Sequence, residues 1–172
     1  MRIAVTDACI FIDVIDLQLT SHLFGLELEI HTSLDVFNEL YAEQQQLLRA
    51  YQSVNKLVIH NINSDEKTAI VQEAFPKSLS ENDKTVIFLA RKLDAMLLSS
   101  DKAVRHYARL QSIEYHGMLW IFDCLLEYSL IQHSDAIQKL TELTNRNIVY
   151  QNNAELMSEV KKRIRAWTKK IS

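Results

Sequence analysis

Hydrophobic residues fall along this chain in short uninterrupted runs, separated by longer stretches in which they recur at helical spacing. The runs that predict strands lie at residues 3–5, 28–32, 57–59, 95–98 and 113–115. A continuous apolar run is typical of a strand that helices cover on both faces of a sheet, so we expect the strands to be mainly parallel.

Between these runs, apolar residues return every three or four positions, which predicts amphipathic helices. The expected helices span residues 9–17, 20–26, 33–40, 64–75, 80–93, 102–110, 117–126 and 154–171. The pattern also allows the helix that Ser33 caps to run on to Tyr51. The alternation of strands and helices predicts a three-layer α/β/α sandwich with a central, mainly parallel twisted sheet and extra C-terminal helices.

Composition narrows the class of protein. The chain has 172 residues, 48% of them hydrophobic, and only two glycines and one proline, so we expect a substantial core without flexible linkers. No run approaches the roughly 20 apolar residues that span a membrane, and we expect a cytoplasmic protein. Cys9 and Cys124 match no paired metal spacing and are expected to be buried reduced thiols. A net charge of −3 neither indicates nor excludes nucleic-acid binding.

Four acids stand out by their positions. Asp7 and Asp101 follow two of the apolar runs, and ligands of open parallel sheets bind beyond the carboxyl ends of the strands. Asp83 stands three residues after Ser80, and Glu39 lies in the middle of the expected helix after the second strand.

Each acid alone has a simple structural explanation, because Asp caps helices and Glu occupies solvated helix faces. Together at one crevice, they would repel one another by about 4 kcal/mol per pair at 4 Å in a partly shielded site. A divalent cation would relieve that repulsion. Oxygen ligands without thiolate or imidazole favour Mg²⁺ or Mn²⁺ over zinc.

The segments around these acids resemble, in order, the four motifs of the PIN domains, a family of metal-dependent ribonucleases. The matching segments are Ile3–Ile12, Ser33–Leu40, Leu79–Val86 and Leu97–Arg105. Cys9 stands where the family usually has Asn or Ser, which weakens a hydrogen bond near the ligands but removes none of them. The resemblance covers residues 1–131, which we expect to form the nuclease domain, with residues 132–172 as a helical extension packed on it.

The resemblance implies an endoribonuclease in which one or two Mg²⁺ or Mn²⁺ ions activate water to hydrolyse RNA phosphodiester bonds. The implied catalytic residues and metal ligands are Asp7, Glu39, Asp83 and Asp101. Thr6 and Ser99 are expected to orient the ligands through hydrogen bonds. The candidate RNA contacts are Lys84, Lys102 and Arg105, although a solvated charged face would explain the latter two nearly as well.

Family resemblance further suggests a toxin of a toxin–antitoxin pair, an antitoxin partner and a homodimer. The main alternative is a PIN-like module that binds RNA or protein without cleaving it. A receiver or an aspartyl phosphatase fits less well, because Asp7 is followed by Ala8 and Cys9 rather than by a further acid. The basic C-terminal helix is expected to pack on its own domain through an apolar stripe; contacts with RNA, a second copy or an antitoxin remain open.

Overall fold

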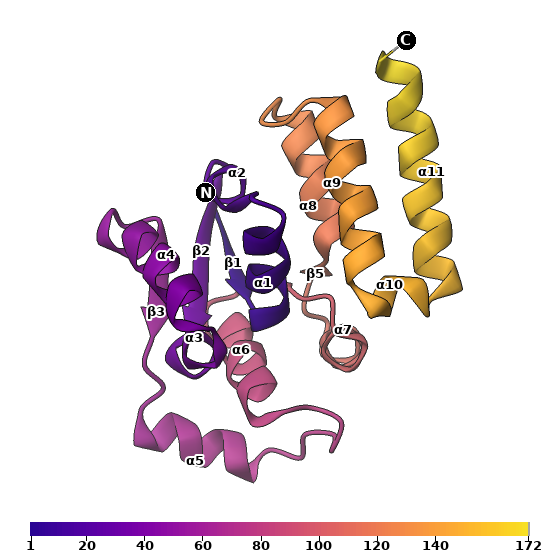
Figure 1. Cartoon of the computed structure of the whole chain (residues 1–172). Coiled ribbons are helices and arrows are strands. Elements are labelled where there is room, and N and C mark those ends of the chain that lie inside the picture. The colour runs from indigo at the N-terminus through magenta and orange to yellow at the C-terminus, as the bar shows by residue number, and fades with distance from the viewer. Residues whose placement is uncertain (172) are drawn as a thin grey trace.

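The computed structural model describes residues 1–171 and shows five parallel strands in the order β3-β2-β1-β4-β5 (Figure 1). The strands are β1 (Arg2–Thr6), β2 (Leu28–Ser33), β3 (Leu57–His60), β4 (Met96–Leu98) and β5 (Tyr115–His116). The helices are α1 (Ala8–Asp16), α2 (Thr20–Leu23), α3 (Leu34–Glu39), α4 (Ala42–Ser53), α5 (Ser64–Gln72), α6 (Glu81–Lys92), α7 (Lys102–Leu110), α8 (Met118–Glu127), α9 (His133–Arg146), α10 (Ile148–Gln151) and α11 (Ala154–Ile171). The predicted α/β/α fold with a parallel sheet is confirmed.

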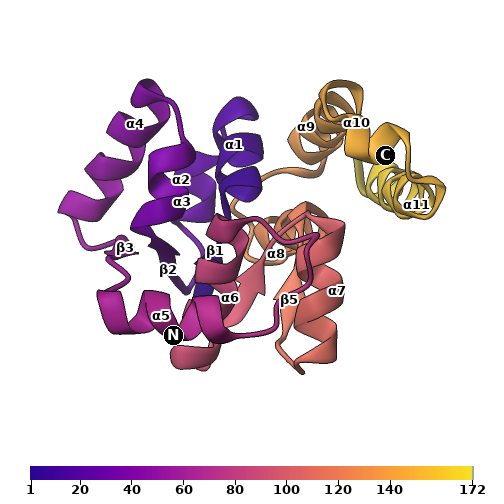
Figure 2. The same cartoon turned by 90° about the horizontal axis from the view of Figure 1, so that it is seen from below.

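Side chains of the central strands alternate between two hydrophobic clusters, one on each face of the sheet. Ala4 and Leu98 belong to the cluster shared with α1, α8 and the C-terminal helices, whereas Val5 and Leu97 belong to the cluster shared with α6 and α7. The helices form layers on either side of the sheet (Figure 2). Because successive residues of a strand point to opposite faces, a run that is apolar throughout is buried on both sides.

The predicted extension of the helix from Ser33 to Tyr51 is wrong. Helix α3 ends at Glu39, and Leu40 turns into an extended conformation with ψ near 151° while its side chain is buried. Helix α4 then begins after Tyr41, whose backbone N–H donates to the Gln44 side chain. The break lets Leu40 and the apolar face of α4 enter the same core.

Several boundaries also differ from expectation; helix α2, for example, ends at Leu23 rather than at residue 26. Helix α5 stops at Gln72, three residues before the predicted end, since Glu73 is already extended ahead of Pro76. Strand β5 begins at Tyr115 rather than at Ile113, because Ser112 has a positive φ of 56° and the Ile113 N–H still donates to the Ala108 carbonyl of α7.

Helices α9, α10 and α11 cover one side of α1 and α8 and share their core. Figure 1 shows α9 and α11 side by side at one end of the molecule. Val160 and Trp167 on α11 are buried, Leu156 and Ile164 are half-buried against them, and Ile171 is exposed. Most of the apolar stripe therefore packs on its own chain. No helix in residues 1–171 combines the length and hydrophobicity required to cross a membrane.

Candidate active site

The strand order places two of the four acids at the topological switch point of the sheet. From β1 the chain proceeds outward to β2 and β3, and it later returns to the other side of β1 as β4. Asp7 follows β1, and its backbone N–H donates to the Leu98 carbonyl at the end of β4. Asp101 follows β4 by three residues. The crevice beyond such a switch point is where α/β sheets bind ligands.

Asp7 is a buried carboxylate, with 3% of its surface exposed. Its Oδ1 accepts hydrogen bonds from the Ile10 N–H at 3.1 Å and from the Cys9 thiol at 2.8 Å, and so it caps α1. The pKa of Asp7 is raised to about 6, chiefly by burial and in smaller part by the charge of Asp83, although hydrogen bonds from Cys9, Ser99 and Ile10 act in the opposite direction. Among residues 1–171 no cationic side chain forms an ion pair with this buried acid.

Asp83 and Asp101 also cap helices. Oδ2 of Asp83 accepts from the Ser80 N–H at 3.0 Å, and the Ser80 hydroxyl accepts from the Asp83 N–H in return. Oδ1 of Asp101 accepts from the Val104 N–H at 3.0 Å. These caps each use a single carboxylate oxygen, so a capping role is compatible with a ligand role for the other oxygen.

Ser99 links two of the acids, as expected of a residue that orients ligands. Its fully buried hydroxyl accepts from the Asp101 N–H at 3.1 Å, and its hydrogen bond to Asp7 lowers the pKa of that acid. Thr6 differs, because its buried hydroxyl has no hydrogen-bond partner among the described residues. Thr6 is held through its backbone instead, where its carbonyl accepts from Thr32 at 2.7 Å.

Glu39 is the last residue of α3 rather than a mid-helix residue, and its side chain is exposed. Within the described chain it forms no hydrogen bond or ion pair with the other three acids. Likewise, no three His, Cys, Asp or Glu side chains of residues 1–171 stand close enough in this conformation to hold a metal ion. The structure thus links Asp7 to Asp101 through Ser99 and places Asp83 close enough to raise the pKa of Asp7, but within the described chain it does not assemble the expected set of four metal ligands.

A family model described as a PIN domain, DUF3368, matches residues 3–165 of this chain. The chain belongs to the PIN domain family. Its fold is similar to that of a solved PilT N-terminus domain protein from the hyperthermophilic archaeon Sulfolobus solfataricus P2, with a TM-score of 0.51 and 13% identity over 73% of this chain and 95% of that one. At this identity the likeness shows the fold alone. No curated protein matches the sequence. PIN domains are typically nucleases that use divalent metal ions.

Cys9 forms a hydrogen bond with Asp7, the contact that Cys in place of Asn or Ser was expected to weaken. Its thiol donates to Asp7 and its sulfur accepts from the Ser100 N–H at 3.3 Å, so it joins the start of α1 to the loop before Asp101. The pKa of Cys9 is raised by burial and by the Asp7 charge. Sulfur is a weak donor, and the thiol form is the one that can donate.

The sequence did not reveal two groups of residues that shape the site. In the first, the Ser33 and Thr85 hydroxyls lie 2.7 Å apart, and Thr85 donates to the Asn82 carbonyl at 2.6 Å. This buried pair fixes α3 against the first turn of α6, which carries Asp83. The sequence identifies Ser33 only as a helix cap. Thr85 could have been found only as a hydroxyl residue two positions after Asp83.

In the second group, Asp13 lies on the buried face of α1 between apolar neighbours. The pKa of Asp13 is raised to about 6, chiefly by burial and in smaller part by the charges of Asp16 and Asp7. Asn147 acts in the opposite direction by donating long hydrogen bonds of 3.4 and 3.5 Å. The phenol of Tyr150 on α10 lies nearby, and burial raises its pKa as well. Asp13 could have been found in the sequence as an acid within an apolar helix face. Nothing in the sequence pointed to its partners Asn147 and Tyr150.

The three candidate RNA contacts differ in their surroundings. Lys84 pairs with Glu81 at 2.5 Å and is mostly covered. Lys102 is exposed, and the Arg105 guanidinium lies 5.3 Å from the Tyr115 ring centre. Gly117 makes room for Arg105, since a Cβ there would stand 2.7 Å from Nη1. Lys102 and Arg105 therefore remain the better candidates for contact with an anion.

Proposed function

We propose that this PIN domain is a metal-dependent endoribonuclease that hydrolyses RNA phosphodiester bonds with water. One observation carries the proposal: Asp7 is buried at the switch point of the sheet, near Asp83 and joined to Asp101 through Ser99, without a cationic partner in the described chain. Family membership supports it, because PIN domains are typically nucleases.

The donor set fits a hard divalent cation. Asp7, Asp83 and Asp101 offer only carboxylate oxygens, which suit Mg²⁺ and Mn²⁺, and Glu39 would complete the shell or serve a second ion. A bound ion of this kind lowers the pKa of water and stabilises the charge that develops on the phosphoryl oxygens.

The surrounding residues of the chain have separate tasks. Ser99 and Cys9 hold the Asp7 carboxylate in one orientation and favour its charged form through their hydrogen bonds. The Ser33–Thr85 contact keeps the start of α6, and with it Asp83, in place. Lys102 supplies an exposed positive charge at the rim of the site for a substrate phosphate.

The alternative of a binding module without catalytic activity is not favoured by the site. Such a module would have no physical need for a buried, unpaired Asp7 beside Asp83, since burying a charge without a partner is costly. The toxin role, an antitoxin, a homodimer and a cytoplasmic location stay predictions that rest on the sequence and the family resemblance.

The test is cleavage of a pool of single-stranded and structured RNA by the wild-type chain with Mn²⁺ or Mg²⁺. Matched reactions contain EDTA, the Asp83→Asn variant, or Asp65→Asn, which changes an exposed acid in the first turn of α5. Asn at residue 83 can still accept the Ser80 N–H, so the capping box is kept.

We expect metal-dependent cutting that is lost in Asp83→Asn and kept in Asp65→Asn. Equal activity of the two variants would reject the assignment of this site. Folded protein that binds the metal but cuts no RNA in the pool would favour the binding module.

A further inference from the structure

A groove with a volume of about 1090 Å³ lies between α7, β5 and the start of α8 on one side and α10 and α11 on the other. Ser100 and Lys102, the two neighbours of Asp101, form part of its lining. The groove therefore begins at the rim of the acid site and extends toward the C-terminal helices.

Positive charge gathers on one wall of this groove. The basic residues that line it from α7 are Lys102, Arg105, His106 and Arg109. Their spacing of three and four residues puts them on one helix face. In the described chain, neither the lysine nor the two arginines pair with an acid, in contrast to surface residues such as Arg91, which pairs with Glu73. These cations are available to an external anion.

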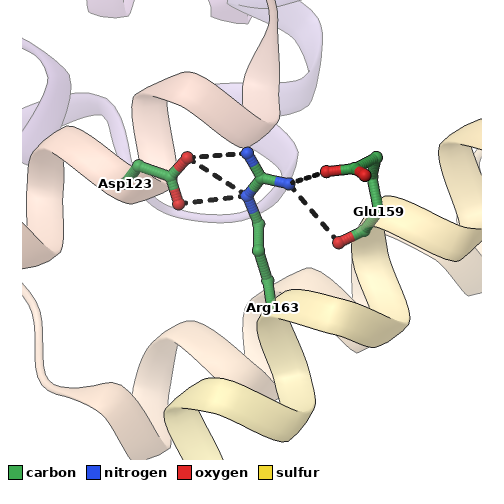
Figure 3. Close-up of polar contacts among 3 residues, drawn as sticks. All are labelled: Asp123, Glu159 and Arg163. Carbon is green, nitrogen blue, oxygen red and sulfur yellow. Dashed lines mark hydrogen bonds and ion pairs between the residues drawn. The ribbon is translucent and has the colours of Figure 1, made fainter.

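Acids from α8 and α11 also line the groove, but most of their charge is compensated. Arg163 on α11 donates from Nε and Nη2 to the Asp123 carboxylate on α8 at 2.8 to 3.1 Å, and from Nη1 to Glu159 Oε2 at 3.0 Å (Figure 3). This contact also ties α11 to α8 across the groove. Glu155 is the remaining acid of the lining, so the groove as a whole favours an anion.

Aromatic rings lie on the same side as the cations. His116 and Trp120 stack with ring centres 4.2 Å apart and planes 15° apart, and Tyr115 lies against Arg105. All three rings are half-buried and line the groove. Positive charge along a groove that also presents aromatic faces is the combination that binds single-stranded nucleic acid, because unpaired bases can stack on the rings. Duplex RNA keeps its bases stacked inside and offers phosphates and 2′-hydroxyls instead.

We propose that this groove binds the single-stranded stretch of RNA adjoining the phosphate that is cut. The α7 cations contact the backbone, and bases stack on the Trp120 and His116 rings. This inference rests on the proposed function, which it deepens by assigning the path that the substrate takes along α7 and the C-terminal helices.

The first experiment measures binding without cleavage. A fluorescein-labelled single-stranded oligoribonucleotide is titrated in EDTA and followed by anisotropy, with the same sequence in a duplex as comparison. The groove variant is Lys102→Gln with Arg109→Gln. The control variant, Lys161→Gln with Arg165→Gln, removes the same charge from a face of α11 that does not line the groove.

We expect the groove variant to raise Kd about tenfold or more and the control to change it less than about twofold. Loss of two phosphate contacts also lowers the slope of log K against log salt by about 1.4, since each contact to a single strand contributes about 0.7. Equal losses in both variants, or tighter binding of the duplex, would overturn the inference.

The second experiment tests base stacking. Trp120 and Trp167 are the two tryptophans of the chain, so Trp167→Phe leaves fluorescence from Trp120 alone. We expect the single strand to quench this emission; unchanged emission at saturating RNA would contradict stacking. If Trp167→Phe does not fold, the wild-type chain serves, because Trp167 is buried in the core and is screened from RNA.

Failure of this inference is distinguishable from failure of the proposed function. Binding in EDTA does not require catalysis, and Asp83→Asn is expected to bind the single strand while losing cleavage. RNA cleavage that survives in the groove variant with unchanged Kd would reject the groove alone. Groove-dependent binding without any metal-dependent cutting would reject the nuclease and retain the single-stranded path.

Discussion

Replacing Asp7 by Asn should stabilise the metal-free protein at neutral pH while abolishing cleavage. The folded chain raises the pKa of Asp7 from an ordinary 3.8 to about 6, so its ionised form is disfavoured by folding. A shift of about two pKa units corresponds to about 3 kcal/mol of unfolding free energy. Asn keeps the size of the side chain and the acceptor for the Ile10 N–H, and a weakened bond to Cys9 offsets part of the gain. We expect a net gain of about 1 to 3 kcal/mol at pH 7.

The dependence on pH gives this prediction its sign. Between pH 3.8 and about 6 the folded state of the wild type binds the Asp7 proton more tightly than the unfolded state does, so the wild type loses stability as pH rises through this range. Asn at residue 7 does not titrate. The difference in unfolding free energy between variant and wild type should therefore grow from pH 4.5 to about pH 7 and then level off.

The assay is urea unfolding in EDTA at several pH values, with Asp16→Asn as an exposed control on the same helix. The control should change the unfolding free energy by less than about 0.5 kcal/mol. Added Mn²⁺ should stabilise the wild type, by about 2.7 kcal/mol at one hundred times its Kd, and Asp7→Asn much less. A destabilised Asp7→Asn, or a difference that does not vary with pH, would refute the idea that this buried carboxylate is uncompensated without metal.

Three further predictions concern the surroundings of the site. Asp13→Asn should also raise stability at pH 7 by up to about 3 kcal/mol, because the pKa of Asp13 is raised to about 6 by burial, and it should retain cleavage. Urea unfolding and the RNA cleavage assay together check this prediction. Loss of cleavage would make Asp13 part of the catalytic set. Thr85→Val should cost about 1 to 3 kcal/mol and lower the cleavage rate, since it leaves the buried Ser33 hydroxyl without its partner; unchanged stability would show that this contact does not hold the helices together. Arg163→Met should cost at most about 1 kcal/mol, because the Asp123 side chain is 41% exposed and water screens the pair; a larger loss in urea unfolding would show that the clamp is essential to the C-terminal helices.

Much of the site was readable because it is built from local signals. Asp7, Asp83 and Asp101 each occupy a helix cap or first turn directly beside an apolar run, and both features are properties of a few consecutive residues. The motif resemblance supplied the order of the acids, and the family match confirms the family that the motifs indicated. The capping role of these acids is confirmed, whereas their role as metal ligands stays a prediction.

Other features depended on contacts between distant parts of the chain. Thr6 and Ser99 are both hydroxyl residues near an acid, but only Ser99 reaches Asp7, because the register of β1 against β4 puts it alongside. Glu39 ends α3 because the helix breaks at Leu40. The break occurs because the Leu40 side chain is buried in the core, which depends on distant residues. No pattern in the sequence indicated that Tyr150 on α10 would lie beside Ser100 in the loop before Asp101.

By itself, the sequence determined the strands, most of the helices, the layered parallel fold and the acids at the strand ends, because apolar periodicity and capping act over a few residues. Only the tertiary structure decided which of those acids is desolvated, which hydroxyl supports it, and where the C-terminal helices meet α7 and α8 to form a groove. Burial and electrostatic interaction are set by all the atoms around a group, and most of those atoms come from residues far away along the chain.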